Sequence, residues 1–139
     1  MMSWQRILPH YFFHAIPVTR MFALTESMSY HLCSHDVDMR KGIYSLYQLV
    51  KSDMKRNPLS GEVFLFVSKN RTTIKILHWE HGGFILYQKK LEKGTFEIPH
   101  FNANSGQYEM KWSTFVLIME GVCIQSVKYR KRIDINLKR

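Results

Sequence analysis

Basic residues interleaved with aromatic residues have the clearest chemical meaning in this sequence. Lys75 and Lys89 fall in two segments that also contain Trp79 and Tyr87. A lysine binds phosphate and an aromatic ring stacks on a base, so this combination is typical of sheets that bind single-stranded nucleic acid. The alternative is that Trp79 and Tyr87 lie beneath a helix, and for Trp79 we favour burial because large aromatic side chains are usually buried.

A second set of cations lies where loops and helix ends are expected. Arg40 and Lys41 stand at the predicted N-terminus of a helix, where backbone N–H groups also attract anions. The alternative is that Asp38 caps that helix and Arg40 pairs with a nearby carboxylate. Lys69 and Arg71 lie in a polar loop ahead of a predicted hairpin and are further candidate phosphate contacts.

The densest positive charge follows Ser126, in a segment with a single acidic residue, Asp134. The candidate nucleic-acid-binding residues in this segment are Lys128, Arg130, Lys131 and Arg132. Cations this close together can meet several phosphates of a polyanion and release several counterions at once. The alternative is a solvated basic tail.

The overall charge also favours an anionic partner. The 139 residues include 20 Lys and Arg against 11 Asp and Glu, a formal net charge of +9, which suits nucleic acid or a phospholipid surface. No run approaches the roughly 18 apolar residues that span a bilayer. Histidines and prolines interrupt any secretory apolar core in residues 1–20, so we expect a cytoplasmic protein with no membrane contact and with Cys33 and Cys123 as free thiols.

Three possible metal ligands alternate along the chain at His31, Cys33 and His35. On a strand they would project from one face, and His78 or His81 would have to supply a fourth ligand for zinc. Their spacing is not that of a pair of zinc knuckles. We therefore predict no metal site and no cofactor.

Carboxylates that could cut DNA are few. A metal-dependent nuclease needs several carboxylates that converge on metal ions, and the candidates are Asp36, Asp38 and Glu80. Capping of a helix explains at least one of the two aspartates. The cysteines give no better support for a nucleophile, because free cysteines are commonly buried and inert. We therefore predict a protein that is not an enzyme.

Hydrophobic periodicity predicts two principal helices. Apolar residues at spacings of three and four predict a helix over residues 39–55, capped by Asp36 or Asp38. A second helix is predicted near the C-terminal part, with Ser113 as its cap and Gly121 as its end.

The strands are predicted between and around these helices. Residues 63–67 are a continuous apolar run, typical of a central strand covered on both faces. Residues 73–80 and 84–91 flank His81-Gly82-Gly83 and predict a hairpin. With the turn centred on Gly82, one face carries Ile74, Ile76 and His78 opposite Phe84, Leu86 and Gln88, and the other carries Lys75, Leu77, Trp79, Ile85, Tyr87 and Lys89.

Shorter strands complete the expected sheet. Two are predicted within residues 22–32, joined by a turn at 25–29, and one at 96–98, whereas residues 100–107 are expected to form a polar loop. The fold class is therefore a single α+β domain with a mainly antiparallel sheet built around the central hairpin and two principal helices.

Several local patterns also match one protein family in sequence order. The matching segments are Asp38-Met39-Arg40-Lys41-Gly42, Pro58-Leu59-Ser60-Gly61, Val63-Phe64-Leu65-Phe66, Asn70-Arg71, Ile74-Lys75-Ile76-Leu77-His78-Trp79, Gly82-Gly83-Phe84, Leu86-Tyr87 with Lys89, Leu91 and Glu92, Gly94-Thr95-Phe96, Trp112 and Met119-Glu120-Gly121. The chain resembles the accessory protein called TnpB, the second open reading frame of the insertion-sequence family numbered sixty-six. Each motif is weak, but their order and spacing over about residues 21–132 are specific.

The resemblance implies a role in moving the insertion sequence, beside a small companion protein and a larger transposase that carries the strand-cutting chemistry. It supplies no catalytic residues. We therefore expect a non-catalytic accessory factor that binds DNA at the element ends or bridges DNA and transposase. The alternatives are a pure protein-interaction subunit without DNA contact and a metal-dependent nuclease.

The resemblance also suggests a division of the chain. Residues 21–126 are expected to form the accessory-protein domain and residues 127–139 a basic tail. Residues 1–20 have no counterpart in the family pattern, so they are interpreted either as a segment upstream of a functional start at Met21 or as a flexible N-terminal arm.

Overall fold

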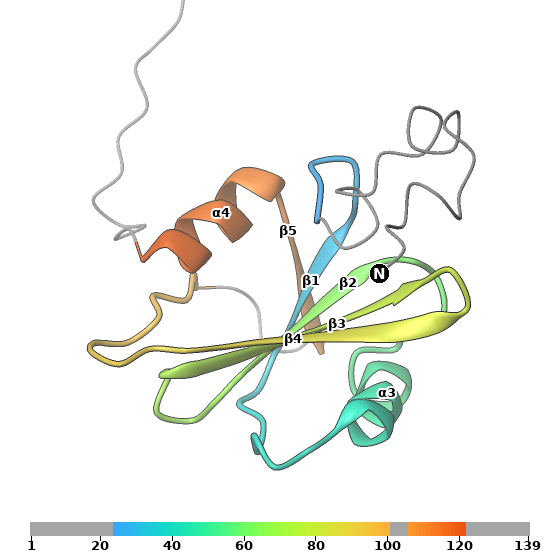
Figure 1. Ribbon diagram of the computed structural model, residues 1–139, viewed down its shortest axis with the longest axis horizontal. Coiled ribbons are helices and arrows are strands. Elements are labelled where there is room, and N and C mark those ends of the chain that lie inside the picture. The colour runs from blue at the N-terminus through green and yellow to red at the C-terminus, as the bar shows by residue number, and fades with distance from the viewer. Residues whose placement is uncertain (1–23, 101–105, 122–139) are drawn as a thin grey trace, which may run out of the picture.

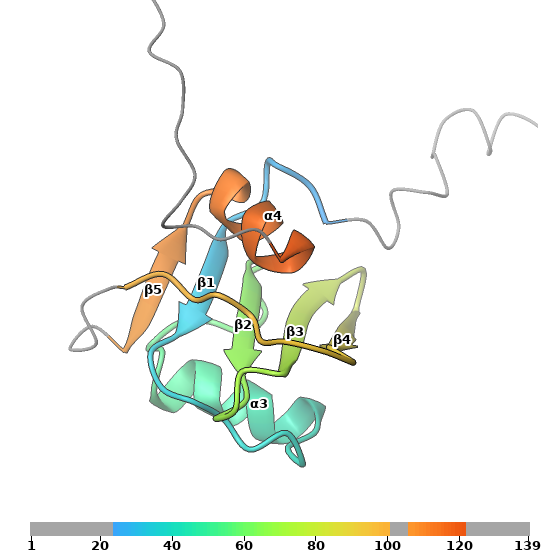
Figure 2. The same cartoon turned by 90° about the vertical axis from the view of Figure 1, so that its left-hand side faces the viewer.

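The computed structural model describes residues 24–100 and 106–121. In these residues a five-stranded sheet in the order β4-β3-β2-β1-β5 lies between two helices (Figure 1). Helix α3 covers one face of the sheet and helix α4 covers the other (Figure 2). The predicted α+β domain is confirmed. None of the helices in the described ranges is long and apolar enough to cross a membrane.

Helix α3 follows the first strand, four strands come next, and helix α4 follows the last strand. Their bounds are β1 Tyr30–Cys33, α3 Ile43–Ser52, β2 Val63–Val67, β3 Thr73–Glu80, β4 Gly83–Lys90, β5 Gln107–Met110 and α4 Trp112–Glu120. Strands β1 and β2 are parallel, whereas the other three neighbouring pairs are antiparallel. Parallel neighbours need a crossover connection, and α3 lies in that connection.

Strand β2 is buried on both faces, as its continuous apolar run predicts. Val63 and Leu65 pack into the core on the α4 side, together with Ile118 of that helix. Phe64 and Phe66 belong to the core on the α3 side. Successive side chains of a strand point to opposite faces, so one central strand supplies both cores.

Helix α3 is shorter than predicted and has a different start. It begins at Ile43, with Gly42 at the N-cap and no side-chain cap. The Asp38 carboxylate instead accepts the backbone N–H of Arg40 (2.9 Å), so the predicted aspartate cap is wrong. The predicted apolar face is correct, because Leu46 and Val50 are buried against the sheet.

The hairpin forms where it was predicted, but the predicted register is wrong by one residue. His81 and Gly82 form the turn with φ angles of 48° and 84°, and Glu80 pairs with Gly83. A two-residue turn of this kind needs positive φ at both positions, so its centre lies between these residues. Because side chains alternate along a strand, the shift moves every side chain of β4 to the opposite face from the predicted one.

Other differences lie at the sheet margin. Residues 107–110 form β5 beside β1, whereas a polar loop was expected up to Gln107. No strand is present at 96–98, although Phe96 is buried and its N–H donates to the Arg71 carbonyl (2.7 Å). Of the two strands expected within residues 22–32, the second is β1, while most of the first lies outside the described residues.

Helix α4 agrees with the prediction at its end and differs at its start. The N-cap is Lys111, without a side-chain cap, so the predicted Ser113 cap is wrong. Gly121 ends the helix with φ 78°, a left-handed conformation that glycine adopts without a Cβ penalty.

Candidate nucleic-acid interface

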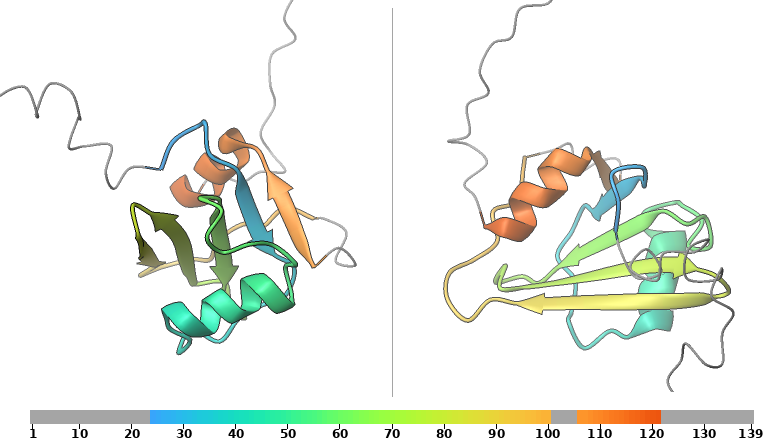
Figure 3. Two further views of the ribbon diagram at one scale, coloured as in Figure 1. Left: turned by 90° about the vertical axis from the view of Figure 1, so that its right-hand side faces the viewer. Right: turned by 45° about the horizontal axis from the view of Figure 1, so that its top comes forward.

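The ends of all five described strands meet at one end of the sheet. Strands β1, β2 and β4 end there, and β3 and β5 begin there, as the parallel and antiparallel pairings require (Figure 3). The Val37 N–H donates to the Val67 carbonyl (2.9 Å), which holds the segment after β1 against the end of β2. Residues that are far apart in the sequence therefore share this end.

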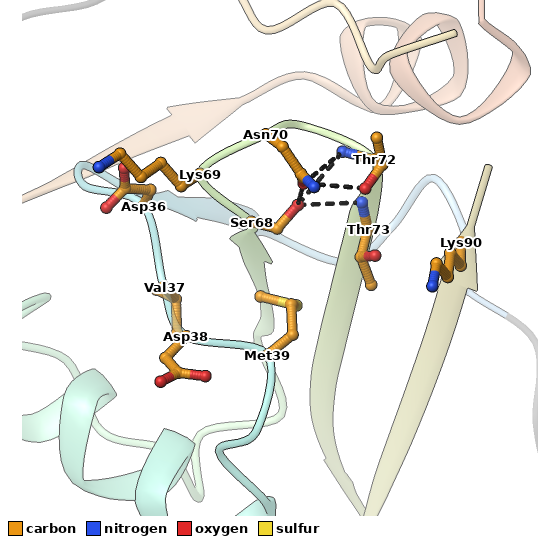
Figure 4. Close-up of a pocket in the computed structure, with 10 residues that line it drawn as sticks. All are labelled: Asp36, Val37, Asp38, Met39, Ser68, Lys69, Asn70, Thr72, Thr73 and Lys90. Carbon is orange, nitrogen blue, oxygen red and sulfur yellow. Dashed lines mark hydrogen bonds between the residues drawn. The ribbon is translucent and has the colours of Figure 1, made fainter. Parts of the chain in front are cut away.

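A hollow of about 750 Å³ opens at this end of the sheet (Figure 4). Its lining residues are Asp36, Val37, Asp38, Met39, Ser68, Lys69, Asn70, Thr72, Thr73 and Lys90. Lys69 also lines a second hollow of about 200 Å³, together with Arg71, which does not line the first. We call the exposed cations Lys69, Arg71 and Lys90 the basic rim.

The loop between β2 and β3 holds two of these cations on an ordered backbone. Ser68 Oγ accepts the N–H groups of Thr72 (3.2 Å) and Thr73 (3.1 Å) and donates to Asn70 Oδ1 (2.7 Å). Asn70 Oδ1 also accepts the Thr72 hydroxyl (2.8 Å), and Figure 4 shows these bonds as dashed lines. Side-chain to backbone bonds of this kind fix a turn, so the Cα positions of the loop cations are set.

The basic rim is positively charged because its cations have no acidic partner among the described residues. The two carboxylates in the larger hollow are Asp36 and Asp38. Arg40 neutralises Asp38, with Nη2 at 2.6 Å from Oδ2, and its hydrogen bonds lower the pKa of Asp38 to about 2. Arg40 is thus paired with a nearby acid, which was the alternative to a direct phosphate contact.

Lys75 was predicted to be exposed, but it is buried and contributes to the fold. It is buried on the α3 side, where its Nζ donates to the Lys41 carbonyl (2.7 Å). The bond ties the segment before α3 to the sheet. Lys41 itself is half-buried.

Lys89 and Tyr87 lie on the other side of the sheet. Lys89 is exposed, but its Nζ donates to the Met119 carbonyl (2.7 Å) in the last turn of α4, where carbonyl groups attract a cation. Tyr87 is half-buried against the α4-side core, and burial raises its pKa.

The predicted face for single-stranded nucleic acid is therefore not formed. The shift in hairpin register places Lys75 and Trp79 on the face opposite Tyr87 and Lys89. Trp79 is half-buried against Phe84, with ring centroids 4.9 Å apart. The four basic candidates of residues 128–132 lie outside the described residues.

The three alternating metal-ligand candidates have other partners. His35 Nε2 lies 2.7 Å from Asp53 Oδ2, and Cys33 is buried in the α3-side core, where burial raises the pKa of its thiol. His31 is fully buried, and its Nδ1 lies 2.7 Å from Gln107 Oε1. Within residues 24–100 and 106–121, no group of three or more possible ligands is arranged to hold a metal ion.

His31 belongs to a set of charged and polar residues that the sequence did not predict. We call His31, Arg56, Glu62 and Gln107 the buried polar cluster, in which His31 is fully buried and the other three residues are half-buried around it. The Glu62 carboxylate accepts hydrogen bonds from Arg56 Nη2 (2.6 Å) and Arg56 Nε (3.1 Å). Its Oε2 also lies 2.7 Å from His31 Nε2, in a close contact that is not an aligned hydrogen bond. Burial raises the pKa of Glu62, but hydrogen bonds from Arg56 and Ser60 outweigh it and hold that pKa below the ordinary value.

Lys90 is the cation of the basic rim that sequence reasoning missed. The predicted hairpin could have identified Lys90, because pairing of Lys90 with Thr73 places it beside the loop that carries Lys69 and Arg71. The buried polar cluster had no such local signal, because His31 and Gln107 are 76 positions apart.

The comparisons with known proteins agree with the resemblance seen in the sequence. The family described as "IS66 Orf2 like protein" matches residues 28–129, which include all five strands and both helices described above. An uncharacterized protein of Sinorhizobium fredii, y4jC, is 31% identical over 97 residues, or 70% of this chain and 81% of the relative. A second from that organism, y4hO, is 29% identical over 85 residues, or 61% and 72%.

No solved structure is significantly similar to this chain. The family match, by contrast, extends across the whole sheet, both helices and the loops that carry the basic rim. The chain therefore belongs to the IS66 Orf2-like family, whose members are associated with the transposition of insertion sequences.

Proposed function

We propose that this protein is a non-catalytic accessory factor of insertion-sequence transposition and that it binds DNA through the basic rim. The observation that carries the proposal is the placement of Lys69, Arg71 and Lys90 around the hollows at one end of the sheet. Each is exposed, and none forms an ion pair within the described part of the chain. Lysine and arginine in such positions form charge-assisted hydrogen bonds with phosphate oxygens.

The chemistry of this end favours phosphate contacts over base reading. The Ser68 hydroxyl and the Asn70 carbonyl oxygen are engaged within the loop, which leaves the cations as its main outward binding groups. Phosphate contacts position a protein on DNA without reading sequence. We therefore expect weak sequence preference from this surface, with residues 128–132 as a second phosphate-binding segment.

The proposal assigns no bond-making step to this chain. Asp36 and Asp38 line the larger hollow, but Asp38 is paired with Arg40. Glu80 stands at the far end of β3, about 23 Å from Thr73 at roughly 3.3 Å per residue. The three candidate carboxylates therefore do not converge as a metal-dependent nuclease requires.

The role would be carried out beside other components of the insertion sequence. In this proposal the DNA is that of the element ends, and the protein partners are the transposase and the small companion protein. All of them would meet in the cytoplasm. The strand-cutting chemistry would belong to the transposase.

Salt-dependent DNA binding tests the proposal. A triple alanine variant of Lys69, Arg71 and Lys90 should bind element-end duplex DNA more weakly. The slope of log affinity against log salt should decrease by roughly 0.9 for each phosphate contact removed. The matched control removes three exposed cations from other surfaces, namely Lys51, Lys55 and Lys111. Equal weakening in both variants would show that only net charge matters and would refute the basic rim as the site.

A second candidate function is a protein-interaction subunit without DNA contact. The observation that favours it is the exposure of two large apolar side chains, Tyr44 (79%) and Leu59 (45%). Docking through apolar side chains depends much less on salt than phosphate contacts do. Binding to transposase that persists at high salt, together with no measurable DNA affinity, would place this function first.

A further inference from the structure

Strand β4 is one of the two outer strands of the sheet (Figure 3). It has eight residues, whereas the other outer strand, β5, has four. In the described residues β4 pairs only with β3, so its outer side has no strand beside it. A long outer strand with unpaired backbone groups is a template for another strand.

The backbone groups that face outward can be identified residue by residue. The Leu91 N–H donates to the Thr72 carbonyl (2.8 Å), so at this end of the hairpin the odd-numbered residue bonds toward β3. Hydrogen-bonded and non-hydrogen-bonded pairs alternate along an antiparallel ladder. The N–H and C=O groups of Phe84, Leu86 and Gln88 therefore point away from β3.

The two halves of this edge differ in chemistry. Residues 84–87 are uncharged and half-buried, whereas Gln88, Lys89 and Lys90 are exposed, and Lys93 follows them. Lysines protect an outer strand against unwanted pairing, so the first half of β4 lacks that protection.

Helix α3 adds apolar surface below the first half of β4. The Tyr47 ring packs edge-on against Phe84, with centroids 5.8 Å apart at 80°. Tyr44, one turn earlier on the same helix, is 79% exposed. A strand added beside β4 would thus find aromatic and aliphatic side chains on its α3 side and cations near its other end.

We propose that the outer edge of β4 binds an extended segment of a partner protein as an additional strand. The segment has alternating apolar side chains and carries carboxylates where it passes Lys93, which lies outside the basic rim. This inference goes beyond the proposed DNA contact, because it assigns a separate surface to a protein partner. Strand addition derives its affinity from main-chain hydrogen bonds, while side-chain pockets and charge select the partner.

Other occupants fit this edge less well. Two copies of the chain, each with a formal net charge of +9, would repel each other. A second copy would also offer no carboxylate-rich strand to pair with the lysines. Nucleic acid has no backbone N–H and C=O row to pair with a strand. Its bases would also find one ring of the aromatic surface occupied, since Lys51 Nζ lies 5.4 Å from the Tyr47 ring centroid.

Gln88 allows a test that leaves the β3–β4 ladder intact. Its side chain is exposed and its N–H faces outward, so Gln88→Pro removes one donor from the edge without removing a ladder bond. Gln88→Thr keeps the N–H and is the matched control. Random 12-residue peptides would be displayed and selected against the full wild-type chain, and the affinities of the enriched peptides for all variants would be measured.

The expected peptides alternate apolar residues and carry Asp or Glu toward one end. They should bind Gln88→Pro at least tenfold more weakly than wild type and bind Gln88→Thr about as well as wild type. Lys93→Glu, at an exposed position after β4, should also weaken them severalfold and keeps the test decisive if Gln88→Pro does not fold. DNA binding should be unchanged in Gln88→Pro, so failure of this proposal is separable from failure of the basic rim.

Three results would overturn the inference. The first is an absence of enriched peptides, and the second is enriched peptides that bind Gln88→Pro and Lys93→Glu as tightly as wild type. The third is a wild-type dimer in solution that Gln88→Pro converts to a monomer, which would make a second copy the occupant.

Discussion

The basic rim and the buried polar cluster both gather charged residues at the sheet, but they differ in how the charges are paired. In the buried polar cluster, Glu62 has Arg56 at 2.6 Å and His31 at 2.7 Å, and its side chain is only 18% exposed. The cations of the basic rim face solvent and have no ion pair among the described residues. The difference separates charges that hold the fold from charges that remain available to a ligand.

Substitutions in the two regions should change the stability of the fold by very different amounts. Removal of one member of a buried pair leaves the other charge desolvated and unpaired, which strongly destabilises a protein. Removal of an exposed cation changes stability little, because water and salt screen it. Stability and DNA affinity should therefore respond to different residues.

The largest expected effect on stability is at Glu62. Glu62→Ala leaves Arg56 without its carboxylate and His31 without its close charge partner. We expect a loss of about 2 kcal/mol in the free energy of unfolding, below the 3–5 kcal/mol of fully buried pairs because the Arg56 side chain is partly exposed. Urea unfolding measures this change. A loss below about 0.5 kcal/mol would show that the cluster does not hold the fold.

A smaller loss is expected at Lys75, which the sequence placed among DNA-binding residues. Lys75→Met keeps the apolar stem but leaves the Lys41 carbonyl without its donor. Hydrogen bonds to charged groups contribute about 1.5–3 kcal/mol, so we expect a loss near the lower limit. The salt dependence of DNA binding should not change. If Lys75→Met had normal stability but a smaller slope of log DNA affinity against log salt, Lys75 would be a DNA contact rather than a structural residue.

Glu62 should also contribute to the acid sensitivity of the fold. Its pKa is lower in the folded chain than its ordinary value of 4.5, so its stabilisation is present above that pH and is lost as the pH falls through the folded pKa. The unfolding free energy of the wild type should therefore fall below about pH 4.5 more steeply than that of Glu62→Gln. Parallel curves for the two proteins would contradict the assigned direction.

The smallest effect on stability is expected at the basic rim. The triple alanine variant of Lys69, Arg71 and Lys90 should unfold within about 0.5 kcal/mol of wild type, as surface substitutions usually do. Thermal and urea unfolding check this, beside the DNA titration described above. A large loss of stability would mean that these cations belong to the fold, and the contrast with the buried polar cluster would then fail.

Sequence reasoning succeeded where a feature depends on neighbouring residues. The continuous run of β2 and the apolar spacing of Leu46 and Val50 predicted correctly which faces are buried. The hairpin was found from its glycines, but its register was not. Register depends on which two residues take positive φ, and His81 does so although it is not a glycine.

The candidate site could also be predicted only in part, because it too depends on the hairpin register. Lys69 and Arg71 were identified as loop cations from the sequence. Lys90 was missed because it is distant from them in the sequence and becomes their neighbour only when β3 pairs with β4. The expected surface of Lys75 with Lys89 failed because a one-residue shift separates them to opposite faces.

Local periodicity thus predicted the core-facing sides of β2 and α3, because burial repeats with the period of the helix or strand, but it did not predict the faces of β4, which depend on the hairpin register. Which strands become neighbours is decided by packing of the folded chain. The pairing of β1 with both β2 and β5 brings His31 between Glu62 and Gln107, and no local pattern contains that information. The contact between His31 and Gln107, which are 76 positions apart, depends on β1 and β5 being neighbours in the sheet. The basic rim needs only the β3–β4 hairpin, which places Lys90 beside the loop that carries Lys69 and Arg71.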